Sequence, residues 1–295
     1  MADRPAKRGA ERRSPDDDPM AAGLRRSIEL LWGVEKRPAR GPKPALTIEG
    51  IVAAAVELAD REGLAALSMA RIAKELGFTT MSLYRYVQSK DELMMLMVDA
   101  GLGAPPAMDD IGDDWRAGLA RWARACMAAF LAHPWSVKVP ITGPPIAPNN
   151  VAWLNACLEA LTSTALEEQE KANIVLLISG FVRNEANMTR DLSESDDPQM
   201  VADGPRPTYG DALRIVATAD QFPALFRTIE SGAFDDGGEY GDEEFEFGLA
   251  TLLDGVAVLV ERRAPASSRG RRDAKRGAKR DARQASRGSS SSSSG

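Results

Sequence analysis

Hydroxyl, aromatic and basic side chains gather between Thr79 and Lys90, a mixture that suits contact with nucleic acid. Hydroxyl and guanidinium groups bond to phosphate oxygens, while short polar and apolar side chains read base edges in the major groove. On a helix over this stretch, Leu83 and Val87 turn toward the protein, so the side chains between them point outward. The outward set, our first candidates for DNA contact, comprises Thr80, Met81, Ser82, Tyr84 and Arg85.

Presenting such a surface requires two short helices that cross at a fixed angle. Gly77 falls where the first helix must end, because glycine readily adopts the left-handed conformation that closes a helix. Thr79 or Thr80 can cap the second helix, which the pattern predicts over residues 80–86. The apolar positions that bury one face of each helix are Ile72, Leu76, Phe78, Leu83 and Val87. The segment 67–93 therefore predicts a helix-turn-helix.

Further helices are expected on both sides of this motif. Residues 48–62 carry apolar side chains at helical spacing, with Thr47 as the cap at the start and Gly63 at the end. Ser89 can cap another helix that begins at Lys90. An ordinary amphipathic turn with solvated hydroxyls is the alternative for the motif alone, but capped neighbours favour a three-helix DNA-binding unit.

This unit resembles the DNA-binding domain of the tetracycline-repressor (TetR) family. The resemblance runs from Leu46 to about Val98 and includes a helix, a glycine, a small polar turn and the run Leu83-Tyr84-Arg85-Tyr86-Val87. It implies base-edge contacts from Thr80, Met81 and Tyr84. It implies phosphate contacts from Thr79, Ser82, Tyr86 and Lys90, with Ser68 and Arg71 on the flanking backbone.

Two positions of the motif modify what the resemblance implies. Lys90 has a second reason to hold phosphate, since it lies at a helix N-terminus whose free amides attract anions. Ala70 stands where the family often has a basic residue, so a contact is absent there. The bases that are read do not follow from these residues.

Both ends of the chain are basic, whereas its body is acidic. The whole chain has 37 basic and 43 acidic residues, a net charge of −6. Residues 1–45 hold 11 basic against 7 acidic, and residues 262–295 hold 11 against 2, which leaves 15 basic and 34 acidic between them. This asymmetry suggests tails that follow the phosphate backbone while the body stays away from it; simple solvation is the alternative.

The ends are expected to lack a packed core. Residues 1–22 show no periodicity and no apolar run of a secretion signal. Prolines hold the stretch 36–43 extended, so it is either a minor-groove arm or a flexible linker. Its basic residues are Lys36, Arg37, Arg40 and Lys43. Residues 267–295, rich in Arg and Ser, are expected to be a disordered tail that adds either non-specific DNA affinity or solubility.

The remainder has helical periodicity and very little strand character, so we predict an all-α fold. Its helices are expected at 115–132, from 150 or 151 to 161, from 166 to about 191, around 209–219 and 223–231, and at 242–263, with loops at 140–148 and 193–207. We predict four parts: an N-terminal basic arm over 1–45, a DNA-binding domain over 46–100, a helical regulatory and dimerisation domain over 101–263, and a tail over 264–295.

Large adaptable side chains in the second domain could line a ligand cavity, although plain core is the alternative for each. This set comprises Trp122, Met127, Trp135, Trp153, Phe181 and Met188. Asn184 and Asn187 lie on a helix expected to be mostly buried, where amides need partners that a ligand can supply. The family resemblance implies an inducer pocket here, in which a small hydrophobic effector changes the separation of the recognition helices.

The last helix is apolar on more than one face, so a second copy of the chain is expected to cover it. Gly248 and Gly255 are expected to allow close approach. The resemblance implies a four-helix dimer interface with Ile174, Ile178, Phe247, Leu252, Val256 and Leu259. Two recognition helices then lie about 34–36 Å apart, which implies a palindromic operator.

Enzymatic chemistry has no motif in this sequence. His133 is the single histidine, and HExxH, GxSxG and phosphate-cradling glycine patterns are missing. Cys126 and Cys157 are expected to be reduced core thiols of a cytoplasmic protein, with no cofactor, metal or membrane span. We therefore expect a homodimeric, ligand-responsive repressor; the alternative is a structural DNA-binding protein whose helical domain only dimerises.

Overall fold

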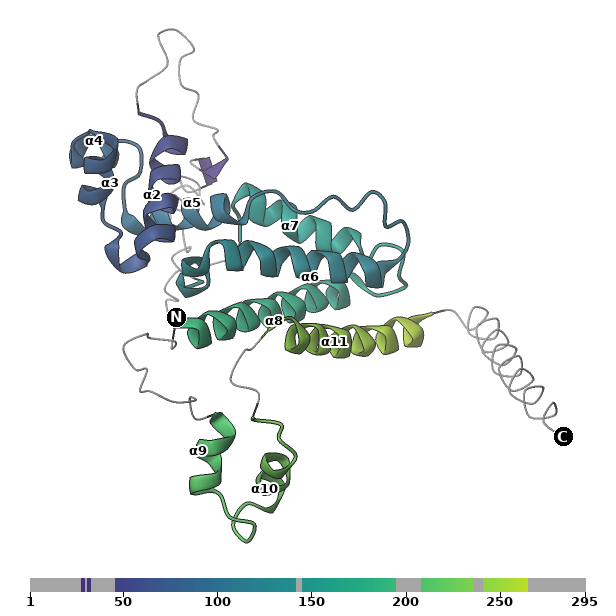
Figure 1. Ribbon diagram of the computed structural model, residues 1–295. Coiled ribbons are helices and arrows are strands. Elements are labelled where there is room, and N and C mark those ends of the chain that lie inside the picture. The colour runs from purple at the N-terminus through teal and green to yellow at the C-terminus, as the bar shows by residue number, and fades with distance from the viewer. Residues whose placement is uncertain are drawn as a thin grey trace, which may run out of the picture. The chain divides into compact units, whose positions relative to one another are not determined.

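The computed structural model describes residues 28–29, 31–32, 46–141, 145–194, 208–235 and 241–264. Within these ranges the chain is helical and contains no strand, which confirms the predicted all-α class (Figure 1). It divides into two compact units. The first comprises Val139–Ala152 and everything described up to Ala104; the second comprises Pro105–Lys138 and the described residues from Trp153 onward. The basic stretch 36–43, the C-terminal tail from residue 265 onward and residues 195–207 of the predicted loop lie outside the described residues.

The first unit is built from short helices with polar caps. They are α2 (Ile48–Glu62), the 3-10 turn η2 (Leu64–Ala66), α3 (Met69–Leu76), α4 (Thr80–Tyr84) and α5 (Lys90–Leu102). Thr47, Ser68, Thr79 and Ser89 each accept a backbone N–H of the following helix. Gly77 ends α3 in the left-handed region, with φ 74°, as predicted. Helix α2 packs on α3 and α5, and α3 packs on α4.

The recognition helix α4 is shorter than the predicted 80–86. Its regular part ends at Tyr84, and the carbonyl of Leu83 accepts from the backbone N–H of both Tyr86 and Val87. Leu83 and Val87 are both fully buried. The chain therefore tightens after Tyr84 because Val87 must return to the core.

The second unit contains the long helices. They are α6 (Trp115–Ala132), α8 (Glu168–Glu194) and α11 (Asp242–Arg263). The 3-10 turn η3 (Pro134–Lys138) follows α6, and α7 (Pro148–Glu159) belongs to this unit from Trp153 onward. Helices α6, α8 and α11 pack side by side around a core that includes Leu119, Ile178 and Leu249 (Figure 1). The bounds of α6 and α11 match the prediction. Helix α7 begins earlier than expected, and the division between the units falls inside it, after Ala152.

Two short helices, α9 (Tyr209–Val216) and α10 (Pro223–Glu230), form a hairpin. Thr208 and Asp211 form a capping box at the start of α9, and Gly210 donates its N–H to the carbonyl of Phe234 at 2.9 Å. The Tyr209 ring meets the Phe234 ring edge to face at 5.6 Å. These local contacts define the hairpin without a large core, in which Ile229 is the one fully buried large side chain among the described residues 208–235.

Candidate nucleic-acid interface

Helix α4 presents its large side chains to solvent. Met81 is 73% exposed and Tyr84 is 41% exposed, whereas Leu83 between them is fully buried. Arg85 is exposed, while Thr80 and Tyr86 are half-buried. The burial of Leu83 fixes the rotation of the helix, so the predicted base-reading residues share its outer face. A helix with one anchored apolar residue and an outer polar and aromatic face can enter a major groove.

Hydroxyl groups border this outer face. Thr79 Oγ1 accepts the backbone N–H of Ser82 at 3.3 Å and lies 2.9 Å from Ser82 Oγ. Lys90 is exposed at the first position of α5, directly after the cap Ser89. The structure therefore brings the predicted phosphate ligands Thr79 and Ser82 together, and it places Lys90 at a helix N-terminus as expected.

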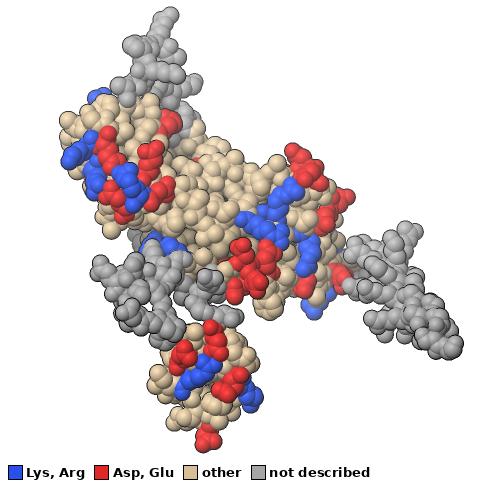
Figure 2. Space-filling view, in the orientation of Figure 1, with Lys and Arg blue, Asp and Glu red and all other residues tan. Residues whose placement is uncertain are grey.

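The start of α3 carries an ion-pair cluster that was not predicted from the sequence. Arg71 Nη2 lies 2.7 Å from Glu62 Oε1, and Arg61 bridges Glu62 at 3.2 Å and Glu75 at 2.7 Å. Figure 2 shows basic and acidic side chains intermingled on this unit. Arg71 is exposed, but its guanidinium already has a carboxylate partner. A phosphate must therefore compete with Glu62 for Arg71.

The predicted aromatic ligand residues separate into two groups. Trp122 and Trp153 are buried and meet edge to face at 5.6 Å, and Trp122 Nε1 donates to the carbonyl of Trp153 at 2.8 Å. Trp135 is also buried. Phe181 is half-buried and stacks on Phe245 of α11 at 5.6 Å, and Met127 is half-buried. The three tryptophans thus lie in the core of the second unit.

The prediction that the α8 amides are buried is wrong. Asn184 is exposed and donates to Met188 Sδ at 3.4 Å, and half-buried Asn187 donates to Asp191 Oδ2 at 3.0 Å. The register of α8 explains this, because Ile178 and Val182 turn inward and carry the amides outward. The polar side chains that are buried on α8 are Lys171, Glu185 and Arg190.

The two cysteines are free and buried, which confirms the predicted core thiols. Burial raises the pKa of both Cys126 and Cys157 to about 12, so both thiols stay protonated near neutral pH. Arg183, half-buried near Cys126, donates to the carbonyl of Val137 at 2.6 Å, and burial lowers its pKa.

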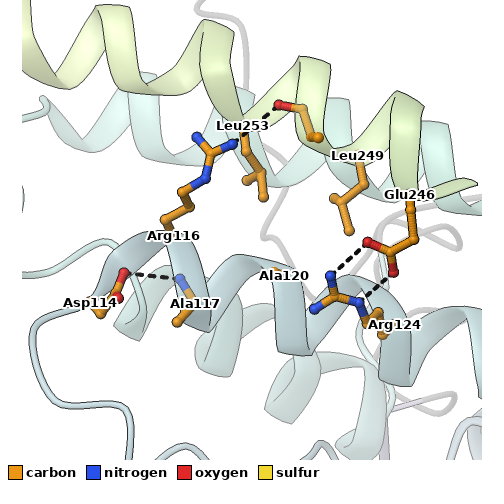
Figure 3. Close-up of a pocket in the computed structure, with 9 residues that line it drawn as sticks. Asp114, Arg116, Ala117, Ala120, Arg124, Glu246, Leu249 and Leu253 are labelled. Carbon is orange, nitrogen blue, oxygen red and sulfur yellow. Dashed lines mark hydrogen bonds and ion pairs between the residues drawn. The ribbon is translucent and has the colours of Figure 1, made fainter. Parts of the chain in front are cut away.

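A groove of about 310 Å³ lies between α6 and α11 (Figure 3). Ion pairs bridge the two helices beside it: Arg124 Nη2 bonds to Glu246 Oε2 at 2.7 Å, and Arg116 Nη2 lies 2.7 Å from Asp254 Oδ1. Between the two ion pairs, small and aliphatic side chains such as Ala120 and Leu249 line the groove. The predicted ligand residues do not line this groove, and its arginines are already neutralised. We therefore assign it to helix packing.

Family models match both parts of the chain. The model for bacterial regulatory proteins of the tetR family matches residues 51–95, and the model for the tetracyclin repressor-like C-terminal domain matches residues 105–260. The chain belongs to the tetR family. It is a DNA-binding transcriptional regulator, and α3 and α4 are its helix-turn-helix.

Relatives of this tetR-family chain align over most of their length. The HTH-type transcriptional repressor DrrR1 of Streptomyces coeruleorubidus is 35% identical over 247 residues, which are 83% of this chain and 90% of the repressor. The tetracycline repressor protein class A from transposon 1721 of Escherichia coli is 27% identical over 75% of this chain and 95% of its own. The crystal structure of the TetR family protein ActR from Streptomyces coelicolor in complex with actinorhodin has 27% identity and a TM-score of 0.63, covering 76% and 100% of the two chains.

The predicted tetR-family interface residues divide by exposure. Ile174, Ile178 and Val256 are buried in the core of a single chain, so their assignment to a surface between two copies is wrong. Phe247 is 76% exposed, Leu259 is exposed and Leu252 is half-buried. Three exposed apolar residues were not among those predicted, namely Leu176 and Leu177 on α8 and Val258 on α11.

The glycines of α11 also differ from each other. A Cβ on Gly248 would lie 2.6 Å from a ring carbon of Phe181, so this glycine admits a neighbour within the same chain. Gly255 has open space where a Cβ would be. Close approach by a second chain is therefore possible at Gly255 and not at Gly248.

None of the helices in the described ranges is long and apolar enough to cross a membrane.

Proposed function

We propose that this chain is a homodimeric repressor that binds an inverted-repeat operator and leaves it when a small apolar molecule occupies its helical unit. The observation that carries the proposal is the outer face of α4, where Met81 and Tyr84 are exposed on a helix anchored by Leu83. In this proposal Thr80, Met81 and Tyr84 contact base edges. Thr79, Ser82, Tyr86 and Lys90 hold phosphates beside them, and Ser68, Arg71 and Arg85 extend this surface.

Dimerisation is supported by the apolar surface that α8 and α11 leave uncovered. Leu176 is 71% exposed and Phe247 is 76% exposed, and both lie on long helices that pack against each other. Large apolar side chains left exposed on neighbouring helices are typical of a protein–protein contact. Two copies joined there can present two recognition helices to successive major grooves about 34–36 Å apart.

An effector site in the second unit is supported by its aromatic core and by one hydroxyl. Ser136 Oγ is buried and has no hydrogen-bond partner among the described residues, although buried polar groups are normally paired. Ser136 lies in η3 beside Trp135, and η3 packs against α6 and α8. ActR, the relative crystallised with actinorhodin, suggests a similar class of effector for this chain. We propose a flat, largely apolar molecule whose oxygen atoms bond to Ser136.

The test is release from specific DNA. An operator is first selected from random duplexes with the full-length chain, and binding is then followed by fluorescence anisotropy at physiological salt while planar polycyclic compounds, actinorhodin included, are added. We expect at least one compound to release the operator, and Ser136→Ala to weaken that release without changing operator affinity. Equal binding to operator and unrelated duplexes, unaffected by every compound, would support the structural DNA-binding alternative instead.

A further inference from the structure

A buried acid near the end of α5 binds the first turn of α7. Asp99 is 8% exposed and lies three residues before Leu102, the last residue of α5. Its Oδ1 accepts from Asn150 twice, from the backbone N–H and from Nδ2, each at 3.0 Å. Asn149 Nδ2 donates to Asp99 Oδ2 at 3.1 Å and to the Asp99 carbonyl at 3.0 Å. We call these three residues the Asp99 cluster.

The physical chemistry of the Asp99 cluster favours one geometry. A buried carboxylate is costly unless hydrogen bonds satisfy it, and the first turn of a helix offers unpaired amides and a positive dipole end. Asn149 and Asn150 lie in the first turn of α7, which begins at Pro148. Amide side chains donate along fixed directions, unlike a mobile ammonium group. The cluster therefore fixes both the distance and the rotation of α5 against the start of α7.

The helix on one side of the cluster belongs to the DNA-binding core. Leu93 and Met97 of α5 are fully buried, and α5 packs on α2. The same α5 begins at Lys90, and only five residues separate it from the end of α4 at Tyr84. A movement of α5 would therefore carry the recognition helix with it.

The helix on the other side continues into the aromatic core. One turn after Asn149, Trp153 of α7 is buried and its carbonyl accepts from Trp122 Nε1. Cys157, a further turn along, is also buried. Helix α7 thus has its first turn bonded to Asp99 and its next turns packed in the core of the second unit.

We infer that the Asp99 cluster is the positioning contact through which α7 fixes the orientation of α5, and with it α4, for reading two half-sites at one separation. Asp99 does not touch DNA in this inference; it acts through α5. The inference rests on the proposed function, because a fixed separation matters only to a dimer on an inverted repeat. Its consequence is specific: without the cluster each DNA-binding unit still binds a half-site, but the preference for one spacing is lost.

The experiment measures spacing preference with the full-length chain. Duplexes carry the selected half-site either once or as inverted repeats whose spacers differ by single base pairs. The test variants are Asn149→Ala/Asn150→Ala, which removes the side-chain donors, and Asp99→Ala, which removes the carboxylate that accepts from them. Asn155→Ala is the matched control, because Asn155 lies on the same helix, is exposed and donates to Glu159 of that helix at 2.9 Å.

We expect the affinity ratio between the best and the neighbouring spacing to fall about tenfold in both variants, within the usual range of coupling between sites. Half-site affinity should stay unchanged, and Asn155→Ala should behave as wild type. An unchanged ratio in the variants overturns the inference alone. Parallel loss of half-site binding in both variants assigns the cluster to folding and also overturns it. A wild-type chain with no spacing preference overturns the dimeric operator proposal and this inference together.

Discussion

Helix α4 and helix α11 both leave large side chains in solvent, but they do so in different chemical surroundings. On α4, exposed Met81 and Tyr84 lie among hydroxyls and basic residues. On α11, exposed Phe247 and Val258 lie on a long helix beside the apolar surface of α8. The first arrangement suits a polar, charged partner, and the second suits an apolar one. The exposed side chains of α4 and α11 are therefore expected to meet different partners, and their neighbours indicate which kind.

The largest effect is expected from a charge placed on the exposed surface of α11. In Phe247→Glu, a carboxylate would be buried without a partner if a second copy covers this residue, so we expect the dimer to dissociate. Operator affinity should then fall about 10²–10⁴-fold, because two linked half-site contacts become independent. Sedimentation velocity and anisotropy measure the two effects.

Ile215→Glu is the matched control for this variant. Ile215 is also highly exposed, but it lies on α9 rather than on α8 or α11. The Ile215→Glu variant should leave the sedimentation coefficient and operator affinity unchanged. A dimeric Phe247→Glu protein would show that α11 is not the contact surface.

The next largest effect is expected on the α4 surface. Met81→Ala and Tyr84→Ala should each lower operator affinity by about 5–150-fold, since a base contact contributes about 1–3 kcal/mol. Binding to unrelated duplexes should hardly change. Tyr209→Ala, which removes an exposed tyrosine on α9, is the control and should bind as wild type. Equal losses on specific and unrelated DNA would instead place these residues on phosphates.

A smaller effect, of opposite sign, is expected from the ion pair that holds Arg71. Glu62→Gln frees the guanidinium for phosphate, so affinity should rise about threefold to tenfold and the salt dependence should steepen by about one counterion. Glu57→Gln makes the same charge change at an exposed position of the same helix and is the control. If both variants raise affinity equally, net charge rather than Arg71 is responsible.

The smallest effect is expected from the ion pair between Arg124 of α6 and Glu246 of α11. The hydrogen bond from Arg124 lowers the pKa of Glu246 below its ordinary value of 4.5, so the stabilisation is present above that value and is lost as pH falls through the lowered pKa. Glu246→Gln should reduce the free energy of unfolding by less than about 1 kcal/mol near neutral pH, because the pair is half exposed. Urea unfolding at about pH 7 and about pH 2 measures this, with no difference expected in acid. If the unfolding free energies of wild type and Glu246→Gln differ more in acid than near neutral pH, the Arg124–Glu246 ion pair is not the cause of the difference.

The sequence sufficed where local signals define an element. Capping residues such as Thr47 and Ser89, and Gly77 with its positive φ, mark helix ends within a few residues of sequence. The helices 48–62, 115–132 and 242–263 were therefore predicted with their observed bounds. The outward face of α4 followed from two buried residues, Leu83 and Val87.

Contacts between distant segments could not be predicted in the same way. Asp99 meets Asn149 and Asn150 about fifty residues away, and nothing in their own neighbourhoods indicates the pairing. The rotation of α8 was also beyond local periodicity, because its apolar residues lie on two faces and a single pattern does not say which face is inside. Ile174 was consequently assigned to the interface and Leu176 was missed.

The proposal that two copies of the chain read an inverted-repeat operator is tested most directly by a footprint. The full-length chain is bound, at physiological salt, to the DNA that flanks its own gene. We predict a protected inverted repeat with two half-sites about one helical turn apart, and its loss in Tyr84→Ala. Uniform protection along the DNA, or a protected site that Tyr84→Ala leaves intact, would contradict the account.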